Sequence, residues 1–250
     1  MKIILSPAKK MIADTDNIAP VELPAFIDKT AEILGWMKSK SKEELKAIWK
    51  CNDKIAEQNF NRLETMDLYN RLTPAVLAYE GIAFQYMAPA VFEIQQFEYL
   101  QNHLRILSAF YGILKPLDGV TPYRLEMQTK AEIEETTNLY DYWGDRLYHS
   151  VIDDSRIIIN LASKEYSKCI EKYLTPQDRY ISVTFCEASG DKMVTKGTYA
   201  KMARGEMVRF MAENNIENPV DIKKFDRLGY SFRSDLSSDT EYVFERKIEQ

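Results

Sequence analysis

The sequence predicts a single compact α/β domain in which helices surround a mixed sheet. Short apolar runs, of which residues 2–6 are the first, alternate along the 250-residue chain with segments of helical periodicity. Two further runs, 180–187 and 193–197, flank the turn Ser189-Gly190-Asp191 and predict a hairpin. A hairpin among strands that helices otherwise separate indicates a mixed sheet rather than a purely parallel one.

The first quarter of the chain predicts a strand, a loop and three helices. Residues 2–6 form a buried strand that ends at a Ser-Pro turn, and the polar, proline-marked residues 11–24 form a loop. A helix is expected around 25–38. Ser41 followed by Glu44 is a capping-box pattern that begins the next helix. After a break at 50–53 another helix follows, so segment 41–64 has the outline of a helix–hairpin–helix.

The remaining elements follow from the same kinds of pattern. Pro74 opens a helix that ends near Gly81, and Pro116, Gly119 and Pro122 mark a long loop. The other expected elements are, in chain order, a helix at 94–108, a strand at 156–160, a helix from the cap Ser163 to about 173, a helix at 198–214 and a last strand at 242–246.

Composition sets the class of protein. Apolar residues make up 45% of the chain, enough for one sizeable core over 1–250. The net charge of −5, from 38 acidic and 33 basic residues, is unlike that of a protein that binds nucleic acid through its overall field. Charge balance alone therefore favours a small-molecule enzyme, and any binding of phosphates requires a local basic surface.

Cysteine and histidine are too few for the usual metal or disulfide frameworks. The three cysteines are far apart, and only two histidines exist. We therefore expect no metal and no cofactor, and a reducing, cytoplasmic location. No apolar run is long enough for a signal peptide or a membrane span.

Polar residues at two predicted strand ends are candidates for ligand binding. Ser6 to Lys10 follow the first strand, and Asn160 to Tyr166 join a strand to a helix whose amino end suits an anion. Lys164 adds positive charge there. The alternatives are a solvated loop with surface lysines and ordinary capping of the helix by Ser163.

Residues 105–130 mix charged and aromatic side chains with turn formers, which is typical of functional loops. Tyr123 and Arg124 could stack on a base or clamp a phosphate, and Asp118 or Glu126 could act as acid or base. Ion pairs that hold the loop to the core are the alternative, with equal weight.

Two segments carry clustered lysine or arginine. Lys201 and Arg204 lie one turn apart on the predicted helix 198–214 and form a basic face that could follow a phosphate backbone or be merely solvated. In 41–64, Lys50 and Asn52 stand where a DNA-binding hairpin normally has glycine, with Lys54 nearby. An ordinary helical hairpin of the core is the alternative for this segment.

Several ordered motifs together resemble the YaaA (peroxide stress resistance) family nearly from end to end. They are Ile4-Leu5-Ser6-Pro7-Ala8-Lys9, Ala78-Tyr79-Glu80-Gly81, Leu104-Arg105-Ile106-Leu107-Ser108, 111–118 (YGILKPLD), 122–127 (PYRLEM), Trp143-Gly144, 160–166 (NLASKEY), Ala203-Arg204-Gly205, Gly229-Tyr230 and Val243-Phe244-Glu245-Arg246. Departures from the family pattern are Gln128 after Glu126-Met127, the pair Ala109-Phe110, and the missing glycines at 50 and 52.

The resemblance implies a compact α/β domain with a cationic cleft and a helix–hairpin–helix-like element, acting under hydrogen peroxide and lowering free intracellular iron. The residues expected to bind DNA are Lys50, Asn52, Lys54, Lys201 and Arg204. Those expected in the cleft are Ser6, Lys9, Arg105, Tyr111, Asp118, Tyr123, Arg124, Glu126, Lys164 and Glu165.

Three functions remain open. The first is sequence-tolerant binding of duplex or branched DNA through its backbone. The second is an enzyme acting on a nucleotide, nucleobase or damaged DNA in the cleft, which the carboxylates there favour. The third, binding of iron by carboxylates and tyrosines, ranks last because the usual histidine and cysteine ligand sets are missing from the sequence.

Overall fold

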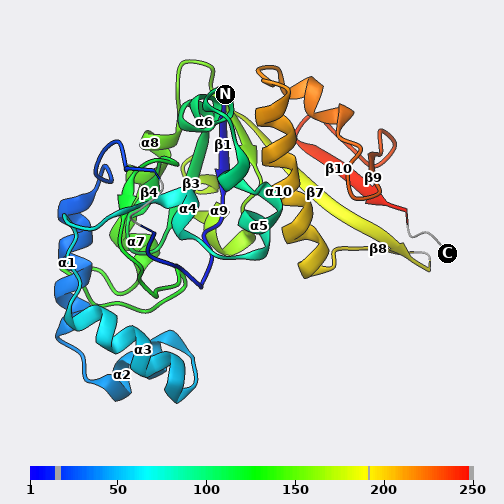
Figure 1. The fold of residues 1–250 in the computed structure, drawn as a ribbon. Helices are drawn as coiled ribbons and strands as arrows, with labels where there is room; N and C mark the ends of the chain where they lie inside the picture. The colour runs from blue at the N-terminus through cyan, green and yellow to red at the C-terminus, as the bar shows by residue number, and fades with distance from the viewer. Residues whose placement is uncertain (15–17, 191, 248–250) are drawn as a thin grey trace.

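A computed structural model of the chain describes residues 1–14, 18–190 and 192–247. Its centre is an eight-stranded sheet in the order β4-β3-β1-β6-β7-β10-β9, with β8 paired to β7 (Figure 1). The strands are β1 (Lys2–Leu5), β3 (Leu104–Ser108), β4 (Gly112–Leu114), β6 (Ile157–Asn160), β7 (Arg179–Ser189), β8 (Lys192–Val194), β9 (Tyr230–Phe232) and β10 (Glu241–Arg246). Strands β2 (Thr73–Pro74) and β5 (Gly119–Val120) form a separate pair.

Most of the helices pack around this sheet, and two project from it (Figure 1). The helices are α1 (Ile27–Lys38), α2 (Lys42–Trp49), α3 (Asp53–Glu64), α4 (Ala75–Ala78), α5 (Ile82–Met87), α6 (Ile94–His103), α7 (Leu139–Trp143), α8 (Arg146–Val151), α9 (Lys164–Glu171) and α10 (Gly197–Glu213), with 3-10 turns at Pro89–Val91 and Pro219–Lys224. Helix α10 crosses β7 and packs on α5 and α6, whereas α8 packs on α9 (Figure 1). Within the described residues, no helix is both long and apolar enough to cross a membrane.

The five central strands run parallel, and their order creates a crevice. Strand β1 pairs with β3 on one side and with β6 on the other, so that Ile4 lies opposite both Arg105 and Asn160. From β1 the chain passes next to β3, whereas from β6 it passes in the other direction to β7. In open α/β sheets ligands bind at such a reversal, outside the carboxyl ends of the strands. The ends of β1 and β6 therefore frame the expected binding position.

The predicted mixed α/β class is confirmed, and most elements lie where the patterns put them. The hairpin β7–β8 forms as expected, although Asp191 of its turn lies outside the described residues. One prediction is wrong: 94–108 is a helix only to His103, and Leu104–Ser108 is the buried strand β3. The five-residue strand is buried on both faces, so its sequence has no alternation that would separate it from a helix. Likewise 105–130 is not one loop, because it contains β3, β4 and β5.

Helices α2 and α3 form an arm that projects from the sheet-containing body (Figure 1). The predicted capping box is present: the Ser41 side chain accepts from the backbone of Glu44, and Glu44 accepts from the backbone of Ser41. Lys50 ends α2 in a left-handed conformation with φ of 46°, and Asn52 caps α3 by accepting from Ile55 N. The two predicted helices are therefore present, while binding of DNA by them stays a prediction.

Candidate functional site

A cavity of about 410 Å³ opens at the carboxyl ends of β1 and β6. It is lined by residues that follow both strands and by residues of α5 and α10; its polar members include Ser6, Lys9, Glu126, Glu165, Lys201 and Arg204. This site, called the switch-point cavity below, thus brings together six residues that sequence patterns selected from four separate segments. It lies where the strand order predicts a ligand.

A pair of serines joins the two strand ends. Ser6 Oγ lies 3.1 Å from Ser163 Oγ and accepts a second hydrogen bond, 2.8 Å long, from the backbone N of Ser163. Ser163 is the N-cap residue of α9, but its side chain makes no capping hydrogen bond to that helix. The sequence interpretation of Ser163 as an ordinary side-chain cap is therefore wrong. Its hydroxyl is used to hold the loop after β1 instead.

Two glycines allow the wall of the cavity to close. A Cβ on Gly205 of α10 would lie 1.9 Å from the backbone oxygen of Ala83 in α5. A Cβ on Gly81, just before α5, would lie 2.6 Å from the Cβ of Ala8. Such distances are shorter than any tolerated contact, so only glycine lets α5 approach both neighbours. Helix α5 is thereby held between the loop after β1 and α10, which carries Lys201 and Arg204.

The cations of the cavity differ in how far they are neutralised. Lys9 pairs with Glu126 at 2.5 Å, and Lys10 pairs with Glu80 at 2.7 Å. By contrast, neither Lys201 nor Arg204 makes a hydrogen bond or ion pair with any residue that the structure describes. The Nε of Arg204 is buried, and burial lowers the pKa of this side chain. An unpaired, partly desolvated guanidinium favours an anionic ligand.

Two carboxylates face the same space in different electrostatic states. Burial raises the pKa of Glu165, helped by the negative charge of Glu126. The pKa of Glu126 is lowered by its contacts with Lys9 and Gln128, which outweigh the opposing effect of burial. Gln128 bridges the two, since its backbone N lies 3.4 Å from Glu165 Oε1 and its Nε2 lies 3.3 Å from Glu126 Oε2. The pair provides one carboxyl that is more easily protonated and one that stays ionised.

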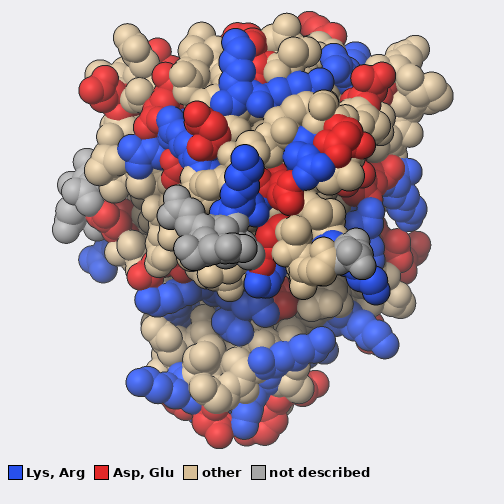
Figure 2. Space-filling model, turned by 90° about the vertical axis from the view of Figure 1, so that its right-hand side faces the viewer, with Lys and Arg blue, Asp and Glu red and all other residues tan. Residues whose placement is uncertain are grey.

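Two further hollows lie beside this cavity, beneath the arm. These hollows, of about 360 and 570 Å³, lie between α2 and residues 126–138 of the body. Glu126 lines both the first hollow and the switch-point cavity, and Ala47 and Ile48 line both hollows. Because they share these lining residues, the three spaces lie next to one another. The two hollows under α2 are called the arm groove. On the face shown in Figure 2, Lys and Arg side chains gather between the body and the lower lobe.

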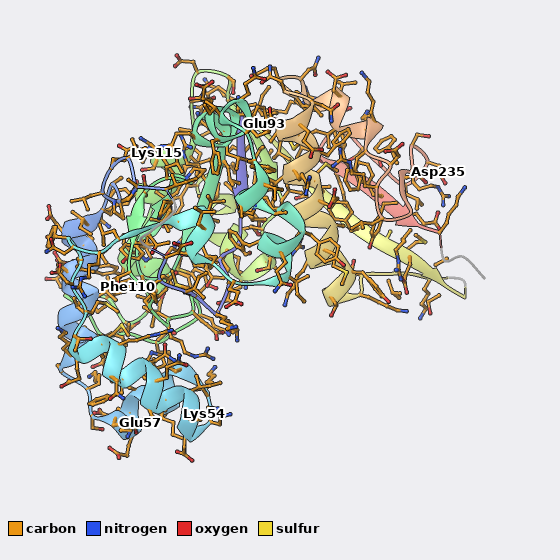
Figure 3. All side chains as sticks on the ribbon, in the orientation of Figure 1. Lys54, Glu57, Glu93, Phe110, Lys115 and Asp235 are labelled. Carbon is orange, nitrogen blue, oxygen red and sulfur yellow. The ribbon has the colours of Figure 1, made fainter. Side chains whose placement is uncertain are left out.

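The lysines of the arm groove are largely free. Lys50 and Lys130 are exposed, and neither pairs with an acidic residue of the described chain; Lys40 lies 5.7 Å from the centre of the Trp36 ring. Lys54 is exposed and similarly unpaired, and Figure 3 shows it on the arm. Asn52 uses its side-chain oxygen to cap α3. In contrast, Lys46 pairs with Asp53 at 2.5 Å, and Lys42 pairs with Glu57.

Arg105 and Asp118, expected in the cleft, instead line a separate cavity of about 240 Å³ with Glu22 and Lys115. Figure 3 shows Lys115 well away from Lys54 of the arm. Arg105 donates to the backbone oxygens of Gln101 and Leu104. Burial raises the pKa of Asp118 to about 7, and its Oδ1 is buried without a hydrogen-bond partner. The expectation that these two residues share the cleft with Ser6 is thus incorrect, because they lie beside the amino end of β3 and the β4–β5 turn.

Four more expected cleft residues are occupied elsewhere. Tyr111 and Tyr123 are buried in the core, so neither ring is available to stack on a base. The Tyr123 hydroxyl contacts Ser108 at 2.7 Å and Tyr79 at 2.9 Å. Arg124 donates a long 3.4 Å hydrogen bond to the carbonyl of Trp49, which joins the body to the arm. Lys164 is exposed, pairs with Glu171 and does not line the cavity.

The residues expected to bind did not include Lys40 and Lys130, which line the groove, or Glu80, which lines the cavity, although the two lysines lie in segments noted for their charge. Glu80 lies in the motif Ala78-Tyr79-Glu80-Gly81, where an acidic residue beside a glycine was the available signal. Lys40 lies just after the end of α1, and Lys130 lies in a loop of the body. Only folding brings the two lysines to the same hollow. Across the described ranges, no three His, Cys, Asp or Glu side chains are grouped as a metal would need.

Comparisons with known proteins cover nearly the whole chain. Residues 1–236 match the family model described as "Peroxide stress protein YaaA". A UPF0246 protein of Agathobacter rectalis is 84% identical over 248 residues, covering 99% of this chain and 100% of the relative. UPF0246 proteins of Lachnoclostridium phytofermentans and Ligilactobacillus salivarius are 54% and 51% identical over 244 residues, covering 98% of this chain and 96% and 99% of their own lengths.

Proposed function

This chain belongs to the peroxide stress protein YaaA family, and we propose that it acts in that response by binding DNA. The contacts are with backbone phosphates, so binding depends little on base sequence and accepts duplex or branched DNA. Lys50 and Lys54 of the arm meet the backbone together with Lys201 and Arg204 of the switch-point cavity.

One observation supports this proposal above the others: the arm groove and the switch-point cavity are neighbours, and both are lined by cations that have no acidic partner among the described residues. Lys130 and Lys50 line the arm groove, and Lys201 and Arg204 line the switch-point cavity. A chain of phosphates needs several cations spaced along a track rather than a single strong site. Within the described residues these cations have no acidic partner, so they remain available to phosphates although the whole protein carries −5 and Glu44, Glu126 and Glu132 also line the groove.

The test is fluorescence anisotropy of labelled duplex and four-way-junction DNA with wild type and with Lys50→Glu/Lys54→Glu. We expect the double variant to bind about tenfold or more weakly at low salt. Lys172→Glu/Lys224→Glu is the matched control, since both side chains are exposed and lie on the body, away from the arm that carries Lys50 and Lys54 and outside the groove and the cavity. Equal weakening by both pairs would mean that only total charge matters, and would refute a specific track.

The proposed role under peroxide follows from binding of the protein along the DNA backbone. Ferrous iron that reacts with peroxide beside DNA damages the strand, and a bound protein shelters the backbone it covers. We propose that this occurs in the cytoplasm. A strain that lacks the protein should accumulate more strand breaks under peroxide, and Lys50→Glu/Lys54→Glu should fail to restore protection. The lowering of free iron is a separate proposal, tested by electron paramagnetic resonance of chelated iron in the same strains.

A second candidate function is chemistry on a nucleotide or nucleobase, and the paired carboxylates of the cavity favour it. Glu165, with its raised pKa, suits a proton donor, and the ionised Glu126 suits a base. If the cavity only binds phosphate, Glu165→Gln removes a negative charge and should tighten DNA binding several-fold. If it catalyses a reaction, the same variant should abolish base release or strand cleavage, which chromatography of incubated DNA detects.

A further inference from the structure

We propose that the switch-point cavity holds one complete nucleotide unit, with its phosphate on Arg204 and Lys201 and its base against the apolar residues that line the same cavity. This inference deepens the proposed function, because it assigns a ligand to the inner end of the DNA path. It concerns a second kind of contact, however, in which a single unit enters the protein rather than lying along its surface.

The phosphate position follows from the unpaired cations. Arg204 and Lys201 are one helical turn apart on α10 and line the same cavity. Leaving a partly buried guanidinium without a partner costs free energy, which a bound anion recovers. The planar fork of arginine matches two phosphate oxygens, and the lysine adds a mobile point charge.

The base position follows from the apolar residues of the cavity. Pro7, Ile82, Phe84, Leu125 and Tyr166 line the cavity together with the charged residues. A nucleotide needs this combination of an apolar surface for its base and cations for its phosphate. The volume of about 410 Å³ lies within the range of about 300–1,000 Å³ typical of small-ligand sites, near its lower end. A single unit therefore fits better than a dinucleotide.

Two hydrogen-bond acceptors complete the site. Glu165 and Glu126 line the cavity and are bridged by Gln128, so their carboxyl oxygens can accept from the amino groups of a base. The nucleotide can come from two sources that present the same chemistry: a free nucleoside monophosphate, or a unit extruded from DNA that lies in the arm groove. Extrusion costs the free energy of unpairing and unstacking one base, which is smallest at mismatched or damaged positions.

The first experiment is isothermal titration of the full chain with dGMP and, separately, with inorganic phosphate. We expect saturable binding of dGMP, at least tenfold tighter than phosphate, with a corresponding rise in Tm. Lys201→Met and Arg204→Met should each weaken dGMP binding about tenfold or more. Lys201 is exposed, so its variant keeps the test valid even if Arg204→Met does not fold. Failure of dGMP to bind wild type, or equal affinity for phosphate alone, would overturn the proposal.

The second experiment separates the sources. Duplex DNA carrying 2-aminopurine opposite an abasic site should become more fluorescent on binding if the unit is extruded. An unchanged signal together with dGMP binding assigns the cavity to free nucleotide. Lys50→Glu/Lys54→Glu should lose DNA affinity but keep dGMP affinity, because neither lysine lines the cavity. DNA binding without any dGMP binding would refute this inference and leave the proposed function intact. Binding of dGMP without any DNA binding would support this inference and refute the proposed function.

Discussion

Ser6 and Ser163 form a direct link between two neighbouring strand ends: Ser6 Oγ accepts from the backbone N of Ser163 at 2.8 Å and lies 3.1 Å from its Oγ. The residues are 157 positions apart in sequence, and their strands are adjacent and parallel. This link holds the loop after β1, which carries Lys9, beside the start of α9, which carries Glu165. Both of these charged residues line the switch-point cavity. The position of the loop after β1 therefore depends on the Ser6 hydroxyl.

Ser6→Ala should destabilise the fold by about 1–2 kcal/mol, because it leaves the Ser163 N–H without its acceptor. Ser163→Ala loses only the contact between the two hydroxyls and should cost less. Thermal unfolding of both variants measures the difference. The reverse order, with Ser163→Ala the more damaging, would show that Ser163 acts as a helix cap after all.

Gly205→Ala should be among the most damaging small substitutions in the chain. The added methyl group meets a backbone oxygen at 1.9 Å, so α5 and α10 must move apart. We expect a loss of about 2–3 kcal/mol and weaker binding in the cavity that these helices line. Gly35→Ala is the control: no atom lies within 4 Å of its added methyl group, and helix propensity predicts a gain of about 0.5–1 kcal/mol. Denaturant unfolding that shows no difference between the two variants would contradict the packing described.

Lys50→Gly should separate stability from DNA binding. Lys50 adopts φ of 46°, which costs a residue with a side chain about 1–2 kcal/mol and costs glycine almost nothing. The variant should therefore unfold at a higher temperature and yet bind DNA more weakly, because it loses a free cation of the arm groove. Improved or unchanged DNA affinity would show that the hairpin backbone, rather than the lysine charge, makes the contact.

Asp118 should make stability depend on pH. Burial raises its pKa to about 7, so the folded state favours the protonated carboxyl. Its contribution to folding is fully present below the pKa of the unfolded chain, about 4, and is lost as the pH rises through the folded value. The side chain of Asp118→Asn does not titrate. Between about pH 4 and pH 7 the free energy of unfolding of wild type should therefore fall by about 1–3 kcal/mol relative to that of the variant. Parallel Tm curves over that pH range would exclude a buried, titrating Asp118.

Local patterns predicted what depends on neighbours in sequence. The capping box at Ser41 and Glu44 and the strand Ile157–Asn160 each follow from a few adjacent residues, and both are present. Strand β3 was misassigned because a fully buried strand beside a helix has no periodicity of its own. The conversion of helix into strand at Leu104 is imposed by pairing with β1, which is about a hundred residues away in sequence.

The sequence predicted which kinds of residue form the candidate site, but not which of the selected residues share one cavity. Lys9, Glu126, Glu165, Lys201 and Arg204 were each singled out, and the fold brings them to one cavity. Arg105, Asp118 and Tyr123 came from the same sequence neighbourhood as Glu126 but point elsewhere, because side chains of a strand alternate between faces and turns redirect the chain. Which charged residues remain unpaired, as Lys50 and Arg204 do, is a property of the folded surface alone.

The most direct test of the proposed DNA track is the salt dependence of binding. Each phosphate contact contributes about 0.9 to the slope of log affinity against log salt concentration. Wild type should show a slope of several, and Lys50→Glu/Lys54→Glu should reduce it by about two, whereas Lys172→Glu/Lys224→Glu should leave it unchanged. No binding by wild type at low salt, or a slope that the groove variant does not change, would contradict backbone recognition along the arm groove.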